Sequence, residues 1–167
     1  MNDEEQLRAA PPGDRTAIAL AVREIARYTE RLIALANPLS QEALWRAPAG
    51  FLNAIGTLAH HLTGNLNHYF GAGILSNGYV RDRDQEFGET GLPKEVVIAE
   101  LRAAVDLAER AAGAITEEQL SRRPWRTPCG EEYASLAYHI VRLATHLALH
   151  VGQAECVESI LTRVREQ

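Results

Sequence analysis

The stretch His146-Leu-Ala-Leu-His150-Val-Gly-Gln153 lies in the longest part of the chain whose apolar residues recur at helical spacing, roughly residues 131 to 165. Side chains four residues apart on an α-helix lie on one face, about one turn from each other. The imidazoles of His146 and His150 can therefore converge on one ion. The stretch predicts a long helix that supplies two ligands of a metal site, so further ligands must come from elsewhere in the chain.

The remaining histidines indicate a second helix as the partner. The six histidines of the chain fall in two segments, 60–68 and 139–150. In the first segment we prefer His61 to His60 as the third ligand, because His61 shares a helix face with Asn65. His61 also lies near the middle of its predicted helix, as the pair above does in its own, so the three rings can be level whichever way the helices run. We expect one metal ion to bridge the two helices.

Other polar residues near these histidines have more than one interpretation. His68 lies seven residues beyond the predicted ligand of its helix, about 10 Å along the axis, which is too far for the same ion. His139 stands in the same relation to the ligands of its own helix. Both are expected to lie beside the site or at the surface. Asn65 and Glu155 could each orient a metal-binding histidine or a bound water. For Glu155 we expect a solvated position instead.

Three imidazoles with positions left open to water are typical of a reactive site and suit zinc, nickel, copper and iron. The residues between His146 and His150 are Leu, Ala and Leu, so the glutamate of zincin proteases is missing. The paired Glu-x-x-His motifs of di-iron bundles are missing as well. The alternative is that these are partly buried packing histidines whose ring N–H groups bond to carbonyls.

The composition is that of one helical domain. The 167 residues are 46% hydrophobic and 23% charged, which argues against the fibrous, disordered and membrane classes. Alanine, leucine, glutamate and arginine are abundant and aromatic residues are sparse, which favours helix. A net charge of −5 argues against nucleic-acid binding, which needs a basic surface. We expect a small-molecule partner, and neither nucleic acid nor membrane.

The N-terminal residues and the two cysteines indicate the cellular compartment of the protein. The N-terminus is acidic where a secretory signal would be basic and then apolar, and no apolar run approaches membrane-spanning length. Cys129 and Cys156 lack the C-x-x-C spacing of thiolate metal sites and do not indicate a disulfide framework. These features predict a cytoplasmic protein without a disulfide.

Apolar periodicity and turn residues divide the chain into elements. Residues 1–13, which end in Pro-Pro-Gly, are expected to be a flexible arm, and residues 14–167 a single domain. Long helices are expected at about 14–36, 52–75, 93–113 and 131–165, with short capped turns at 40–44 and 116–120. Residues 76–92 are polar and rich in glycine, and a loop of that length can cross a bundle.

Two further features concern these elements. The second long helix contains four glycines (56, 64, 71 and 73), each costing about 1 kcal/mol relative to alanine, which suggests close approach of another segment or room for a ligand. The stretch Trp45-Arg-Ala-Pro-Ala-Gly50 resembles Trp125-Arg-Thr-Pro-Cys-Gly130, and each precedes a predicted helix. We interpret this echo as a duplication, with chance similarity of two loops as the alternative.

The acidic and basic run Arg81-Asp-Arg-Asp84 lies in the loop at 76–92. It could bind an anion or cover a pocket, but the commoner meaning of such a run is a solvated loop whose charges pair with one another.

With these motifs the chain resembles the DinB/YfiT-like superfamily of predicted metalloenzymes, in its DinB-like subgroup. The resemblance covers about residues 14 to 165 and is carried by three motifs: His61-Leu-Thr-Gly-Asn-Leu66, Tyr79-Val-Arg-Asp-Arg-Asp-Gln-Glu-Phe87 and His146-x-x-x-His150-Val-Gly-Gln153. It implies an all-α four-helix bundle with a long crossover after the second helix, metal ligands at His61, His146 and His150, and a homodimer. The best understood relatives are transferases that use the thiols mycothiol or bacillithiol.

We therefore expect a divalent-metal-dependent enzyme that acts on a small molecule, with zinc or nickel as the first choices of metal and iron as a further one. The resemblance favours transfer with a low-molecular-weight thiol as the nucleophile. Two other functions stay open: a non-catalytic metal-binding or dimerisation module linked to stress response, and a metal-dependent hydrolase. The sequence identifies neither a general base nor a substrate.

Overall fold

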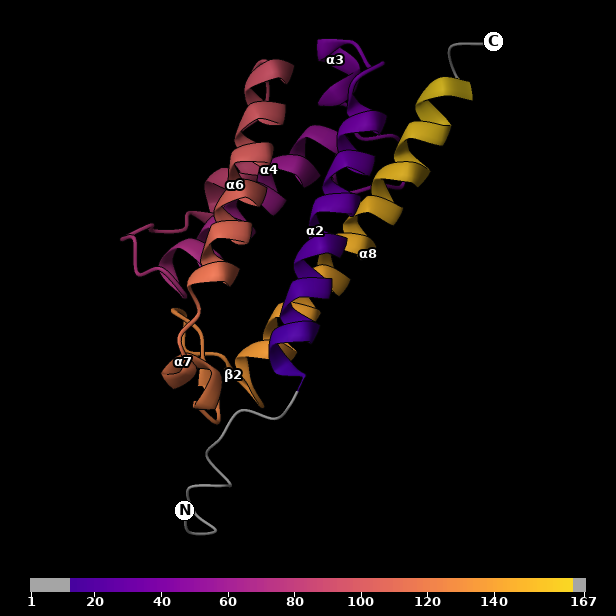
Figure 1. The fold of residues 1–167 in the computed structure, drawn as a ribbon. Helices are drawn as coiled ribbons and strands as arrows, with labels where there is room; N and C mark the ends of the chain where they lie inside the picture. Colours follow the sequence, from indigo (N-terminus) through magenta and orange to yellow (C-terminus); the bar gives the residue numbers. More distant parts are fainter. Residues whose placement is uncertain (1–12, 164–167) are drawn as a thin grey trace, which may run out of the picture.

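The structure, a computed structural model, describes residues 13–163, most of which are helical (Figure 1). The expected arm at 1–13 and the last residues of the chain therefore lie largely outside the described residues. The long segments are α2 (Asp14–Ala36), α4 (Ile55–Leu66) with its π-helical continuation η1 (Asn67–Ala72), α6 (Lys94–Ala114) and α8 (Leu136–Arg163). The short elements are α3 (Gln41–Leu44), α5 (Arg83–Gly88), α7 (Glu117–Ser121), β1 (Trp125–Arg126) and β2 (Glu132–Tyr133).

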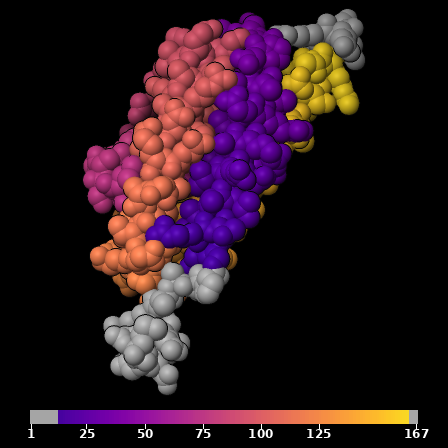
Figure 2. Space-filling model, in the orientation of Figure 1, coloured from indigo at the N-terminus to yellow at the C-terminus, as the bar shows by residue number. Residues whose placement is uncertain are grey.

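The long segments share one apolar core. In Figure 1, α2 and α8 lie side by side, and α4 packs against α6. α2 also contacts α6, and α4 also contacts α8. Each of the four contributes fully buried side chains, such as Ile25, Leu62, Leu101 and Ile140. The all-α class is confirmed, and Figure 2 shows the outer face that α2 and α6 form together.

Hydrogen bonds at the helix ends show which ends of the long segments lie together. The Nζ atom of Lys94, at the start of α6, donates to the carbonyl oxygens of Asn37 and Leu39 at 2.9 Å each, just after α2. Nε2 of Gln119 in α7 donates to the carbonyl oxygen of Ile74, just after η1, at 3.0 Å. The segment that follows η1 and the short helix that follows α6 therefore meet at one end of the molecule.

Two boundaries differ from the sequence-based expectation. The last long helix begins at Leu136 rather than near 131, because the preceding residues form the β1–β2 hairpin, in which Trp125 pairs with Tyr133. Gly130 closes this hairpin with a φ of 87°, a left-handed conformation that favours glycine. The predicted loop at 76–92 also contains a helix, α5, because the Asp82 side chain accepts a hydrogen bond from the backbone N–H of Gln85 and caps it.

The glycines of the second long helix make room for neighbouring side chains. A Cβ atom at Gly56 would lie 2.9 Å from the ring of Trp45, and one at Gly64 would overlap with the carboxylate of Glu86. The expected close approach is therefore confirmed at these two positions, and the partners are Trp45 after α3 and Glu86 of α5.

The order of elements agrees with the predicted duplication. A long helix, a short capped helix, a tryptophan and a second long helix follow one another twice, first as α2, α3, Trp45 and α4, then as α6, α7, Trp125 and α8. Both short helices are capped as expected, by the hydroxyls of Ser40 and Thr116. Among the described helices, none is both long and apolar enough to span a membrane.

Leu62 and Leu52 offer a matched test of the core. Leu62 is 0% exposed and Leu52 is 97% exposed. We expect Leu62→Ala to lower the free energy of unfolding by about 2–5 kcal/mol, because it leaves a cavity. Leu52→Ala should change it by less than about 0.5 kcal/mol. Chemical denaturation measures both, and equal effects would contradict the assigned core.

Candidate metal centre

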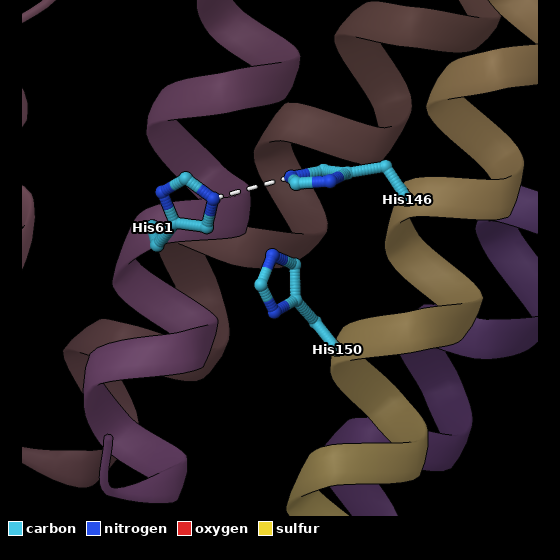
Figure 3. Close-up of side chains that lie close together, drawn as sticks. All are labelled: His61, His146 and His150. Atoms are coloured by element: carbon cyan, nitrogen blue, oxygen red, sulfur yellow. Dashed lines mark hydrogen bonds between the residues drawn. The ribbon is translucent and has the colours of Figure 1, made fainter. Parts of the chain in front are cut away.

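Three histidine side chains from two helices meet in the interior. His61 comes from α4, and His146 and His150 come from α8, one turn apart (Figure 3). One ring nitrogen from each lies within 4.8 Å of the others, and Nε2 of His61 lies 3.2 Å from Nε2 of His146. The structure thus brings together the three residues that the sequence predicts, and this His triad could bind a metal ion.

Hydrogen bonds orient two of the three rings. Nδ1 of His61 lies 2.9 Å from Oε2 of Glu86, and Nδ1 of His150 lies 2.8 Å from Oε1 of Gln153. Both partners are acceptors, so each Nδ1 carries the proton and each Nε2 keeps its lone pair. Histidine ligands of metals are held in the same way in other proteins.

The donor atoms fit a divalent ion. Nε2 of His150 is buried and has no hydrogen-bond partner among the described residues, although a buried lone pair normally has one. Two nitrogens bound at about 2.1 Å in a tetrahedral site lie about 3.4 Å apart. The 3.2 Å between His61 and His146 is close to that value, whereas the widest separation of 4.8 Å must shorten for all three to bind.

Glu86 is fixed on its other side by an arginine. Nε of Arg81 donates to Oε1 of Glu86 at 2.6 Å, and a second guanidinium nitrogen donates to Oε2 at 2.8 Å. Burial alone would raise the pKa of Glu86, but the hydrogen bonds from His61 and Arg81 outweigh it and lower the pKa to about 2. Glu86 is therefore ionised at neutral pH and holds the proton of His61 on Nδ1.

Burial also favours neutral imidazoles in α8. It lowers the pKa of His146 to about 4, helped by the neighbouring His150 and His61 and by nearby arginines. Burial lowers the pKa of His150 as well, against the opposing hydrogen bond to Gln153. Both rings are thus neutral at pH 7 and present lone pairs, which metal binding requires.

The triad lines one end of a cavity of about 380 Å³. The other end is formed by Tyr69 of η1, by Glu131 and Tyr133 of the hairpin, and by His139 of α8. The ring of His139 stacks on that of Tyr133 with centroids 4.4 Å apart, and Tyr69 meets its edge at 4.7 Å. The cavity thus connects the triad to an aromatic wall and is large enough for a small molecule.

Comparison with known proteins agrees with this geometry. A family model described as the DinB superfamily matches residues 24–154, which include every residue of the triad. The chain belongs to the DinB superfamily. No curated protein and no solved structure matches it. The match covers the histidines of α4 and α8 in this DinB-superfamily chain and names no substrate.

The other polar residues near the histidine motifs lie in different environments in this DinB-superfamily chain. His68 and His139 are buried, and His139 lines the cavity, so of the two expected positions the surface one is excluded for both. Asn65 is buried and lines the cavity. Glu155 pairs with Arg31 at the partly exposed surface, as expected for a solvated residue. His60 points into a separate cavity of about 520 Å³ between α4, α5 and α6.

Two residues of the centre escaped prediction from the residues alone. Gln153 follows His150 by three residues, so helical spacing could have identified it. Glu86 gave no such signal, because it lies 25 residues from His61 in a segment that was expected to be a loop. The interpretation of residues 81–84 as a solvated, self-paired run is wrong for Arg81, whose side chain is 8% exposed and paired with Glu86.

His139 predicts a pH dependence of stability. Burial lowers its pKa from 6.5 to about 4, so the unfolded chain binds the proton first as the pH falls. Stability from this residue is present above pH 6.5 and is lost as the pH falls toward 4. Other buried histidines lose stability in the same range, so chemical denaturation at pH 7 and pH 4.5 should show a loss that is smaller in His139→Gln than in the unmodified protein by on the order of 2 kcal/mol. An unchanged loss in the variant would contradict this assignment.

Proposed function

We propose that the protein is a divalent-metal-dependent enzyme, with zinc or nickel as the first choices and iron as a further one, held by His61, His146 and His150. The convergence of these three side chains, with one ring nitrogen of each within 4.8 Å of the others, is the observation that supports this proposal most directly. Three imidazoles are a donor set that late first-row divalent ions accept. Such a set leaves coordination positions for a substrate or water.

The chain's own residues prepare the ligands. Glu86 and Gln153 fix the protons of His61 and His150 on Nδ1, and burial keeps His146 neutral. The cavity that the triad lines is large enough to admit a small molecule. A bound divalent ion would lower the pKa of a thiol or water ligand.

We propose transfer with a low-molecular-weight thiol as the reaction. The support is the superfamily membership together with the open cavity beside the triad. Hydrolysis is the second candidate, because the same open positions accept water as well as a thiol. The two differ in whether turnover needs added thiol.

A non-catalytic module that binds metal or dimerises, linked to stress response, is the alternative from another class. An apolar groove between α2 and α8, lined by Leu20, Tyr28 and Val141 among others, favours it. Leu20 is 55% exposed and Val141 is 41% exposed. Such a surface suits a second copy of the chain, and we propose a homodimer for either function.

We propose a DinB-type four-helix bundle in one domain, residues 14–167, with residues 76–92 as the crossover. The contacts of Lys94 with Asn37 and of Gln119 with Ile74 support this topology. They support a parallel arrangement of α4 and α6, with a connection between them that returns along the bundle.

Metal content tests the site, with His60 as the matched control. We expect about one divalent ion per chain in protein purified without an affinity tag. His61→Ala, His146→Ala and His150→Ala should each lose it, because each removes a ligand. His60→Ala should keep it, because that neighbouring ring lines the other cavity. Glu86→Gln should bind the ion about 10–100-fold more weakly. Full occupancy in the three ligand variants, by elemental analysis, would refute the site.

Activity assays separate the candidate functions. Metal-loaded protein is mixed with a small thiol and an electrophile, and separately with a simple ester. Steady conjugation that needs the thiol and stops on chelation supports transfer. Ester cleavage without thiol supports hydrolysis, and no turnover of either kind with full metal occupancy supports the non-catalytic module.

A further inference from the structure

The cavity contains a buried polar group that the metal centre does not use. The side chain of Asn65 is 5% exposed and lines the cavity one helical turn after His61. It forms no side-chain hydrogen bond with any described residue. The amide is not fully enclosed by protein atoms, so it is open to the cavity and free to form a hydrogen bond with a ligand or water there. Asn65 therefore indicates a polar group of a ligand at its level of the cavity.

The charges around the cavity indicate the sign of that group. Three arginines (Arg81, Arg83 and Arg142) and one carboxylate (Glu131) line it. Arg81 is neutralised by Glu86, whereas Arg83 and Arg142 form no ion pair within residues 13–163. Both are exposed residues at the edge of the cavity, and two guanidinium groups without an ion pair at one cavity contrast with the net charge of −5 of the whole chain. They favour an anionic ligand.

The single carboxylate of the cavity does not cancel these charges. Glu131 accepts hydrogen bonds from the hydroxyl groups of Tyr69 at 3.1 Å and Tyr133 at 3.4 Å. It is held at the aromatic end of the cavity by these phenols. The phenols leave its charge in place, so one carboxylate opposes the two arginines and the cavity keeps an excess of positive charge.

The positions of Asn65 and Arg142 place the anionic group relative to the triad. Tyr69 meets His139 across the cavity, just as His61 meets His146, so α4 and α8 run in opposite directions along it. Asn65 follows His61 by four residues, and Arg142 precedes His146 by four. Both lie about 6 Å along the helix axes from the triad, on the same side.

We propose that this cavity binds a small organic acid, with the carboxylate held by Arg142 and the amide of Asn65 and the reacting group placed at the His triad. Arg83 adds positive charge beside Phe87, whose ring lies 4.8 Å from that of His61. Guanidinium groups bind carboxylates through charge-assisted hydrogen bonds, which are stronger than neutral ones. The role of the triad in this proposal rests on the function proposed above, but the carboxylate subsite can be tested by itself.

Benzoate and benzamide are matched probes, because they share shape and differ in charge. Isothermal titration of the full chain, with and without added zinc, should show benzoate binding about tenfold or more tightly than benzamide. Arg142→Gln and Asn65→Ala should reduce that ratio toward one. Arg46→Gln is the control, since it removes an exposed arginine without an ion pair in the described part of the chain, outside this cavity. It should keep the ratio.

Equal binding of the two probes by the unmodified protein would overturn the proposal. A ratio that survives in Arg142→Gln, or that falls equally in Arg46→Gln, would overturn it too, because binding would then reflect general charge. Circular dichroism confirms that each variant is folded. Metal content measured on the same samples separates the two proposals. A preference for benzoate in protein that binds no metal ion would support the carboxylate subsite and contradict the metal-dependent function. A bound metal ion without a preference for benzoate would contradict only the carboxylate subsite.

Discussion

The buried carboxylate of Glu86 lies between the guanidinium group of Arg81 and the imidazole of His61, and the arrangement of the centre depends on it. A buried charge is tolerated only when partners replace the water it has lost. Here α5 delivers the carboxylate, the preceding residues deliver the guanidinium group, and Gly64 leaves the space that the carboxylate occupies. The connection between η1 and α6 is therefore part of the candidate metal centre as well as a link in the chain.

Much of this architecture could be predicted from the chain itself. The apolar periodicity of α2, α4, α6 and α8 identifies the long helices, because each buries one stripe against the same core. The His146-x-x-x-His150 spacing places two rings on one face by helix geometry alone. His61 could be chosen over its neighbour His60 for the same reason, since adjacent residues on a helix point about 100° apart.

What could not be predicted depends on contacts between segments far apart in the chain. The pairing of Glu86 with His61 spans 25 residues and depends on how α5 docks, which no local pattern encodes. The β1–β2 hairpin is too short to show strand alternation, so the sequence predicts a loop at Trp125–Arg126 and the start of a helix at Glu132–Tyr133. His68 and His139 look like ordinary polar residues in the sequence, and only the packing of Tyr69 and Tyr133 shows that they are buried.

The π-helical turn at η1 has a consequence for comparing this chain with its relatives. A π-turn holds one residue more than an α-turn, so the residues after it are displaced around the helix axis by about 100°. A relative whose helix is α-helical throughout would keep the residue equivalent to Ile74 in the core only if it were one residue shorter here. An alignment gap is therefore expected within Asn67–Ala72, while the motif at His61 stays in register.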